Sequence, residues 1–190
     1  MKIIRIKEAL EKKDEIKELI LQGKIIIYPT DTIYGIGCDA TNMESVSKIR
    51  MIKQRFSKPL SIIAPNKEWI NKNFILEGKE GFLQKIPGPY TLVMEMKQRI
   101  VPMNVSSSMK LGVRMIDNEL QELFDYIGVP IITTSLNITG MENIKDIVEL
   151  QDEKNKAFQD ADLIIDNGTL KGNPSTVIDI TGERPVYYRM

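Results

Sequence analysis

The sequence predicts an α/β protein in which a twisted, mixed β-sheet of about seven strands is flanked by helices. Short apolar runs typical of buried strands alternate with segments in which apolar residues recur every three or four positions, as in amphipathic helices. Several of the apolar runs end in loops rich in threonine, serine or asparagine. Because ligands collect at strand ends in open α/β sheets, these loops predict a concave polar and cationic site.

Composition narrows the classes of function. At 190 residues, one domain spanning residues 1–190 is expected, and it is long enough to bury a core. The 26 Lys and Arg residues balance the 26 Asp and Glu residues, so no overall positive charge indicates a nucleic-acid binder, although a local basic patch is compatible with this balance. A single cysteine, a charged N-terminus and the lack of a long apolar stretch predict a cytoplasmic protein that does not contact a membrane.

The absence of histidine restricts the chemistry further. A Ser-His-Asp triad, a Cys-His pair and a histidine-ligated zinc site are all excluded, and one cysteine excludes thiolate metal sites. We therefore predict no metal site built by the protein itself. Any reaction would depend on Lys and Arg charges, carboxylates, hydroxyls and an Mg²⁺ ion carried in by a substrate.

The first part of the chain contains a strand that ends in a polar turn. Residues 2–5 are expected to form a short strand, and residues 7–22 an amphipathic helix that ends at Gly23. The apolar run 25–28 predicts a buried strand, which Pro29 closes because proline cannot donate to a sheet ladder. The segment that follows contains hydroxyls, a carboxylate and two glycines, and is expected to form a loop.

A helix with a cationic end follows this loop. Thr41 and Glu44 have the spacing of a capping box, and an apolar stripe predicts a helix over about 42–53. At its end, Lys53 and Arg55 are separated by one residue. Together they can converge on a polyphosphate, the arginine through its planar fork and the lysine as a mobile point charge. The other cations of the helix are interpreted as solvated surface charge.

Predicted strands and helices continue to alternate through the rest of the chain. Strands are expected at 60–64, after the Pro-Gly-Pro turn of residues 87–89, and at 111–115, 129–134 and 162–166. Helices are expected at 66–73, 81–85 and 118–126, with one or two more within 144–160. The glycine-containing segment 167–174 is expected to be a flexible loop.

One arginine and a second polar loop stand out in this part of the chain. Arg114 interrupts an apolar strand, which is costly unless its guanidinium finds an anion. A structural ion pair with Asp or Glu is one explanation; the other, which we favour, is that Arg114 belongs to a binding site. Ser135 and Asn137 follow another predicted strand and form a second polar loop at the same sheet edge as the first. Local turn chemistry is the alternative interpretation of these two residues.

Five segments, in the same order, resemble the signature motifs of the YrdC/Sua5 family, the L-threonylcarbamoyladenylate synthases. They are Pro-Thr-Asp-Thr-Ile-Tyr-Gly at 29–35, Lys-Gln-Arg followed by Pro-Leu at 53–60, Gly-Val-Arg at 112–114, Ser-Leu-Asn-Ile-Thr-Gly at 135–140 and Ser-Thr-Val-Ile-Asp at 175–179. The Pro-Gly-Pro-Tyr-Thr segment also resembles the family, but its role in the turn suffices to explain it. Gln54 and Phe56 depart from the family pattern, and Ile63 stands where many members have a histidine.

The resemblance implies a single YrdC-like domain that joins L-threonine, bicarbonate and ATP into threonylcarbamoyl-AMP and pyrophosphate. This product serves the N6-threonylcarbamoyladenosine (t6A) modification of tRNA. Lys53 and Arg55 would be the catalytic groups on the phosphates. The threonine would be held by Thr32, Arg114, Ser135 and Ser175. ATP, bringing Mg²⁺, would contact Lys53, Arg55, Lys58, Lys110, Asn137, Asn143 and Arg189.

Partners follow from the same resemblance. A downstream tRNA threonylcarbamoyl-transferase protein would use the adenylate, and weak direct binding of tRNA is included in this expectation. Two alternatives stay open. One is a YrdC-like module that binds RNA without adenylation, and the other is a paralogous enzyme that adenylates a different carbamoyl or acyl substrate.

Overall fold

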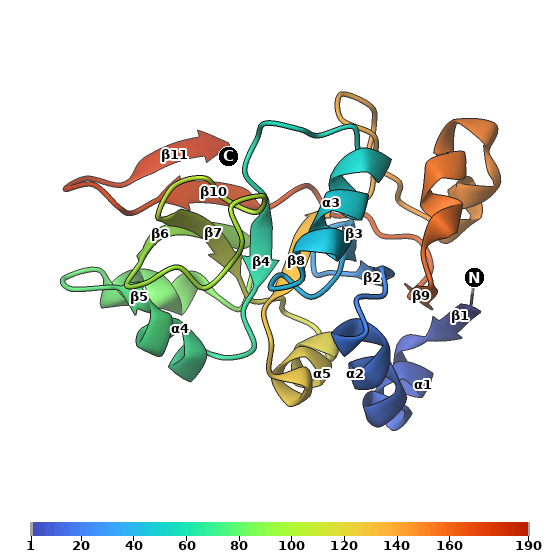
Figure 1. Ribbon diagram of the computed structural model, residues 1–190, viewed down its shortest axis with the longest axis horizontal. Helices are drawn as coiled ribbons and strands as arrows, with labels where there is room; N and C mark the ends of the chain where they lie inside the picture. Colours follow the sequence, from blue (N-terminus) through green and yellow to red (C-terminus); the bar gives the residue numbers. More distant parts are fainter. Residues whose placement is uncertain (1, 190) are drawn as a thin grey trace.

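Figure 1 shows the computed structural model, which describes residues 2–189. Short apolar runs, buried in the core, form the centre of one continuous β-sheet. The sheet contains eleven strands within the described residues. They are β1 (Lys2–Arg5), β2 (Ile26–Pro29), β3 (Tyr34–Gly37), β4 (Ser61–Ile63), β5 (Phe74–Ile75), β6 (Tyr90–Met96), β7 (Lys110–Arg114), β8 (Ile131–Ser135), β9 (Leu163–Asp166), β10 (Thr176–Asp179) and β11 (Val186–Arg189). The predicted mixed α/β fold is confirmed, although the sheet has more strands than the expected seven or so.

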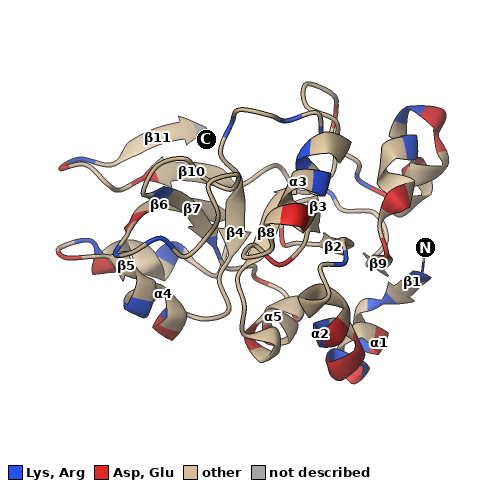
Figure 2. Cartoon of the chain, viewed as in Figure 1, with Lys and Arg blue, Asp and Glu red and all other residues tan. Residues whose placement is uncertain are grey.

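Helices cover both faces of this sheet. They are α1 (Ile6–Glu11), α2 (Lys13–Leu21), α3 (Met43–Ile52), α4 (Lys67–Asn73) and α5 (Leu120–Ile127), with 3₁₀ helices η1 (Glu80–Lys85), η2 (Ile147–Gln151) and η3 (Glu153–Asp160). Successive strand residues point to opposite faces, so Ile26 packs in one apolar cluster with α1, α2 and α5 and Ile27 in another with α3 and α4. Charges of both signs lie on α1, α2 and α4 (Figure 2).

The sheet runs in the order β1-β9-β2-β3-β8-β4-β7-β6-β10-β11, with β5 paired to β6. It is mixed. β9 is parallel to both of its neighbours, and β10 is parallel to β6, whereas β3, β8 and β4 are joined by antiparallel pairs. Gly35 of β3 is in register with Ser135 of β8, so the two polar loops predicted at one sheet edge are neighbours.

The segment after Pro29 is the turn and second strand of a hairpin: residues 30–33 form the predicted loop, but the strand that follows it was not predicted. Pro29 itself belongs to β2, and β3 returns antiparallel with Gly35 and Gly37 inside the strand. A Cβ on Gly37 would lie 2.0 Å from the Ile132 carbonyl oxygen. The glycine is therefore required by the close approach of β8, a reason for strand glycine that a turn interpretation overlooks.

Two helix predictions also need correction. The expected helix over 7–22 is divided at Lys12, whose backbone (φ −107°, ψ 34°) is not helical. The capping box of Thr41 and Glu44 does not form. Asn42 is the N-cap of α3 and accepts a hydrogen bond from the Ser45 N–H at 3.0 Å, while the hydroxyl of Thr41 donates to Asp39. An asparagine one residue later thus takes the capping role.

Candidate active site

Polar side chains from distant parts of the sequence converge on one cavity of about 170 Å³. The hairpin turn, strands β3, β4, β6, β7 and β8, the loop after α3 and the segment around the start of β10 all contribute to its wall. The lining residues are Thr30, Thr32, Ile33, Tyr34, Gly35, Arg55, Ser61, Thr91, Arg114, Thr133, Thr134, Ser135, Pro174, Ser175 and Val177. Eight of them are Ser or Thr and two are Arg, a lining suited to a small polar anion.

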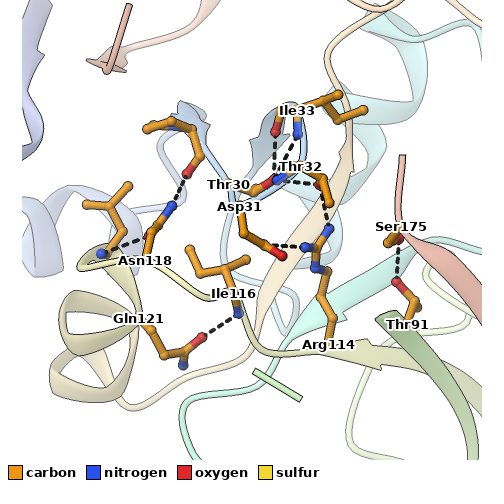
Figure 3. A network of polar contacts seen from close by, with 12 residues as sticks. Thr30, Asp31, Thr32, Ile33, Thr91, Arg114, Ile116, Asn118, Gln121 and Ser175 are labelled. Carbon is orange, nitrogen blue, oxygen red and sulfur yellow. Dashed lines mark hydrogen bonds and ion pairs between the residues drawn. The ribbon is translucent and has the colours of Figure 1, made fainter. Parts of the chain in front are cut away.

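The hairpin turn is held by its own hydroxyls (Figure 3). The Thr30 hydroxyl accepts hydrogen bonds from the backbone N–H groups of Thr32 (3.1 Å) and Ile33 (3.2 Å) and donates to the Ile33 carbonyl (2.7 Å). With the Thr30 proton used in this way, the Thr32 hydroxyl donates to Thr30 at 2.8 Å. The lone pairs of Thr32 then accept from Arg114 Nη1 at 3.3 Å.

Arg114 forms the ion pair that its buried position requires. Its Nη2 donates to Asp31 Oδ1 at 2.5 Å, and the two side chains are only 6% and 9% exposed. Figure 3 shows Asp31 and Thr32 meeting the guanidinium from the hairpin turn, and Thr91 and Ser175 as a separate pair. The structural ion pair considered above is therefore present. Arg114 also lines the cavity, so a clamp on a substrate carboxylate stays a prediction.

Ser175 and Thr91 form a second buried pair on the cavity wall. Their hydroxyl oxygens are 2.9 Å apart, although the residues are 84 positions apart in sequence. The parallel pairing of β10 with β6 brings them together. Ser175 was predicted as a site residue, whereas Thr91 was attributed to its turn. The missing signal was the pairing of these two strands, which only the tertiary structure supplies.

The side chain of Lys53 is buried. It follows α3 directly, is 1% exposed, and is absent from the residues that line the cavity. Its ammonium donates to the carbonyls of Ser135 and Asn137 and to the Asn137 side chain. In this structure Lys53 thus anchors the second polar loop beneath the site, and its contact with phosphate stays a prediction.

The burial of Lys53 predicts a pH-dependent stability. Burial, with a smaller effect from the Arg55 charge, lowers the pKa of Lys53 from 10.5 to about 7. Between pH 7 and 10.5 the unfolded chain keeps a proton on Lys53 that the folded chain has lost, so the free energy of unfolding rises with pH. The stability that depends on a neutral Lys53 is fully present above pH 10.5 and is lost as the pH falls through 7. Between pH 7 and 9 this gain should be roughly 2 kcal/mol in urea denaturation.

Two lysine substitutions test this assignment. Lys53→Met removes the titrating group, so its unfolding free energy should rise less between pH 7 and 9 than that of the wild type. Lys48→Met, at an exposed lysine of α3, should keep the wild-type slope. If the unfolding free energy rises equally with pH in all three proteins, Lys53 does not lose its proton near pH 7 in the folded chain.

The remaining predicted residues divide between the cavity wall and its surroundings. Arg55 lines the cavity, and its Nη2 donates to the Pro59 carbonyl at 2.5 Å. Ser135, also on the wall, donates its hydroxyl to Asn137 Oδ1 at 2.7 Å. Asn137 itself does not line the cavity. Thus the structure brings Arg55, Thr32, Arg114, Ser135 and Ser175 together on one cavity wall, and their contacts with substrate stay predictions.

The other predicted nucleotide contacts lie outside the cavity lining. Lys58 is exposed and Asn143 is half-buried. Lys110, also exposed, forms an ion pair with Asp179 at 3.5 Å. The side chain of Arg189 lies outside the described residues. Their contacts with ATP stay predictions.

The departures from the family pattern also have defined surroundings. Ile63, where many members have a histidine, is fully buried in the apolar cluster beside α5 and does not line the cavity. Phe56 is 74% exposed.

Within residues 2–189, no group of three or more Cys, Asp or Glu side chains is arranged to hold a metal ion, and no helix is long and apolar enough to cross a membrane.

Comparison with known proteins decides the family. The model of the Sua5/YciO/YrdC family, which carries the description "Telomere recombination", matches residues 18–190. The chain belongs to the Sua5/YciO/YrdC family. A Photobacterium profundum member named threonylcarbamoyl-AMP synthase is 33% identical over 76% of this chain and 82% of its own length. A Methanocaldococcus jannaschii member, provisionally given the same name, is 34% identical over 99% of this chain and 92% of its own.

Solved structures of Sua5/YciO/YrdC proteins share this fold. P. abyssi Sua5 complexed with L-threonine is 30% identical, with a TM-score of 0.84 over 99% of this chain. The chain spans 56% of the length of that Sua5 structure. E. coli YciO is 25% identical, with a TM-score of 0.82 over 94% of this chain and 88% of its own. The YrdC-like fold predicted from the motifs is therefore confirmed, as the fold that this chain shares with these family members.

Proposed function

We propose that the chain is an L-threonylcarbamoyladenylate synthase, a nucleotidyltransferase that forms threonylcarbamoyl-AMP and pyrophosphate from L-threonine, bicarbonate and ATP. The observation that carries this proposal is the cavity in which Arg114 lies among the hydroxyls of Thr32, Ser135 and Ser175. Relatives named threonylcarbamoyl-AMP synthase, over most of their length, and the threonine complex of P. abyssi Sua5 support the same assignment.

Arg114 would hold the threonine carboxylate. Asp31 and Thr32 contact Nη2 and Nη1 from the hairpin turn, so the guanidinium is oriented before substrate binds. A charge-assisted pair between a planar guanidinium and a carboxylate is strong and directional. The surrounding Ser and Thr hydroxyls both donate and accept hydrogen bonds, so they can satisfy the polar groups of a bound amino acid.

The reaction requires two bond-forming steps. The threonine amine attacks the bicarbonate carbon and water leaves, which gives a carbamate. A carbamate oxygen then attacks the α-phosphorus of ATP, and the bond from that phosphorus to the bridging oxygen breaks to release pyrophosphate. Such transfers depend mainly on positioning and on neutralising developing charge. Mg²⁺ would enter with ATP as part of the substrate.

Arg55 is the cation best placed for this role, because it already lines the cavity. Lys53 would have to exchange its bonds to Ser135 and Asn137 for a phosphate oxygen. Lys58, Lys110 and Asn143 lie outside the wall, where the larger part of ATP would extend. Asn137 and Arg189 complete the proposed nucleotide contacts.

The product would be passed to a tRNA threonylcarbamoyl-transferase in the cytoplasm for t6A synthesis. Weak direct binding of tRNA is included in this proposal. An RNA-binding module without adenylation has less support, because positive and negative charges balance over the chain.

Pyrophosphate release from ATP by the purified protein tests the proposed function. Release is expected only when threonine, bicarbonate and Mg²⁺ are all present, and mass spectrometry should then detect threonylcarbamoyl-AMP. Loss of release on omitting any one component supports the three-substrate reaction. Release that continues without threonine would contradict it. Untouched ATP together with salt-sensitive RNA binding would instead establish the RNA-binding alternative.

A further inference from the structure

The loop between α3 and β4 carries Arg55 to the cavity, and little side-chain packing holds it there. Residues 53–60 contain no helix or strand, and Figure 1 shows them as a long connection between the two elements. The side chains from residue 56 to residue 59 are all exposed, so no apolar anchor fixes the part of the loop that follows Arg55. Hydrogen bonds therefore have to determine the position of this loop.

Arg50, in the last turn of α3, supplies several of these hydrogen bonds through its side chain. Its Nη1 donates to the Arg55 carbonyl at 2.7 Å, and Nη1 and Nη2 both lie 3.2 Å from the Lys58 carbonyl oxygen. Its Nε donates to the Asn104 carbonyl at 2.5 Å. One planar guanidinium thus joins the loop to α3 and to a neighbouring segment, which a lysine could not do in the same geometry. The prediction that Arg50 is a solvated surface charge was wrong.

The backbone of Arg50 holds Arg55 from the other side. The Arg55 N–H donates to the Arg50 carbonyl at 2.9 Å, and the Gln54 N–H donates to the Met51 carbonyl at 3.1 Å. These two bonds are those of a Schellman turn, in which the residue after the C-cap has a left-handed backbone. Gln54 has this backbone, with φ of 51°, where glycine is the usual residue. The turn therefore carries strain, and the Arg50 side chain helps to keep it in place.

Both polar groups of the Arg55 backbone are thus bonded to Arg50, while the Arg55 side chain lines the cavity. We propose that Arg50 is a positioning residue for the reaction, which holds Arg55 where its guanidinium can meet the phosphates of ATP. Arg50 itself does not line the cavity, so it acts through Arg55. The proposal rests on the proposed function, in which Arg55 neutralises charge on the phosphates.

Arg50→Met tests this role, because it removes the guanidinium and keeps a long side chain that suits a helix. The value of kcat should fall by about 10- to 100-fold, since a misplacement of about 1 Å can cost about 10²-fold in rate. The dissociation constant of threonine, measured by calorimetry without ATP, should not change. Lys48→Met removes a cation from the exposed surface of the same helix and should leave kcat at the wild-type value. Wild-type kcat in Arg50→Met would overturn the proposal.

A double-mutant cycle shows whether Arg50 acts through Arg55. Adding Arg50→Met to Arg55→Ala should lower kcat by no more than about twofold further, because the group that Arg50 positions is already gone. Losses that multiply in the double variant would overturn the proposal, since Arg50 would then act by its own charge or on the fold as a whole. Arg50→Lys keeps the charge but not the planar fork, so its kcat should also fall. A wild-type kcat in Arg50→Lys would contradict positioning by the fork.

Hydrogen exchange separates this proposal from the proposed function, because it requires no turnover. In Arg50→Met, amide exchange measured by mass spectrometry should become faster in the peptide that contains residues 54–59 and stay unchanged in the β-sheet. If the wild type releases no pyrophosphate, the proposed function fails while this measurement still reports how Arg50 holds the loop. If the wild type releases pyrophosphate but exchange in residues 54–59 is unchanged in Arg50→Met, the role of Arg50 fails and the proposed function stands. Should Arg50→Met fail to fold, Arg50→Lys takes its place in both measurements, with the same expected directions.

Discussion

Replacing Arg114 should cause a large loss of activity that is specific to threonine. Arg114→Lys keeps the positive charge but loses the planar fork, so threonine would be held by a single point charge. We expect kcat/KM for threonine to fall by about 10²-fold, equivalent to roughly 3 kcal/mol, because hydrogen bonds to charged groups are worth about 1.5–3 kcal/mol each. The KM for ATP should change little. Steady-state pyrophosphate release at varied threonine measures both effects.

Arg114→Ala would also show how much the ion pair with Asp31 contributes to the stability of the fold. Arg114→Ala leaves the Asp31 carboxylate, 9% exposed, without its cation, and breaking a buried pair in this way costs about 3–5 kcal/mol of stability. The double variant Asp31→Ala/Arg114→Ala removes both charges and should regain most of that stability without regaining threonine binding. Wild-type threonine affinity in Arg114→Lys or in the double variant would remove Arg114 from the amino-acid site.

Arg55→Ala should reduce turnover without unfolding the protein. If Arg55 contacts charge that develops on the phosphates, its loss should lower kcat by about 10²–10³-fold, the range found for single groups that stabilise a transition state. The side chain is half-buried and its hydrogen bond to the Pro59 carbonyl lies in the loop after α3, so the unfolding free energy should change by less than about 1 kcal/mol. Single-turnover kinetics with saturating ATP and thermal unfolding measure these two quantities.

Lys48 provides the matched control for Arg55. It is a cation of α3 whose ammonium pairs with Glu44 at 3.0 Å on the exposed helix surface. Lys48→Ala should leave kcat unchanged and alter stability by no more than about 0.5 kcal/mol. A loss of turnover in Lys48→Ala comparable to that in Arg55→Ala would mean that overall positive charge, and not a specific contact, assists the reaction.

Much of the site could be predicted because its residues lie at strand boundaries. Thr32 follows a buried apolar strand, Ser135 ends another, and a buried arginine in a strand needs an anion. A polar or charged residue at such a place is energetically costly unless it has a partner, and the sequence alone shows where these residues stand. The residues that these groups contact were harder to predict from the sequence. Asp31 is the anion beside Arg114 because of the way the hairpin turn lies over β7. No spacing in the sequence indicates this pairing.

Lys53 shows why residue spacing alone was insufficient. Lysine and arginine two positions apart at a helix end suggest a phosphate clamp, yet only Arg55 lines the cavity. The Lys53 side chain instead turns under a loop more than 80 residues away, whose carbonyls need donors. Conversely, β3 was missed because its glycines resemble a turn, while the reason for Gly37 lies across the sheet at Ile132.

The insertion of β9 between β1 and β2 has a consequence for how the molecule is assembled. β1 pairs with no described strand except β9, and β2 meets β9 on the side away from β3. The N-terminal strand therefore cannot join the sheet until the segment 163–166, near the other end of the chain, has been synthesised. Such long-range pairing slows folding and leaves strand edges open to other chains in the meantime. A nascent chain would hold β1 unpaired while more than a hundred and fifty further residues are added to it.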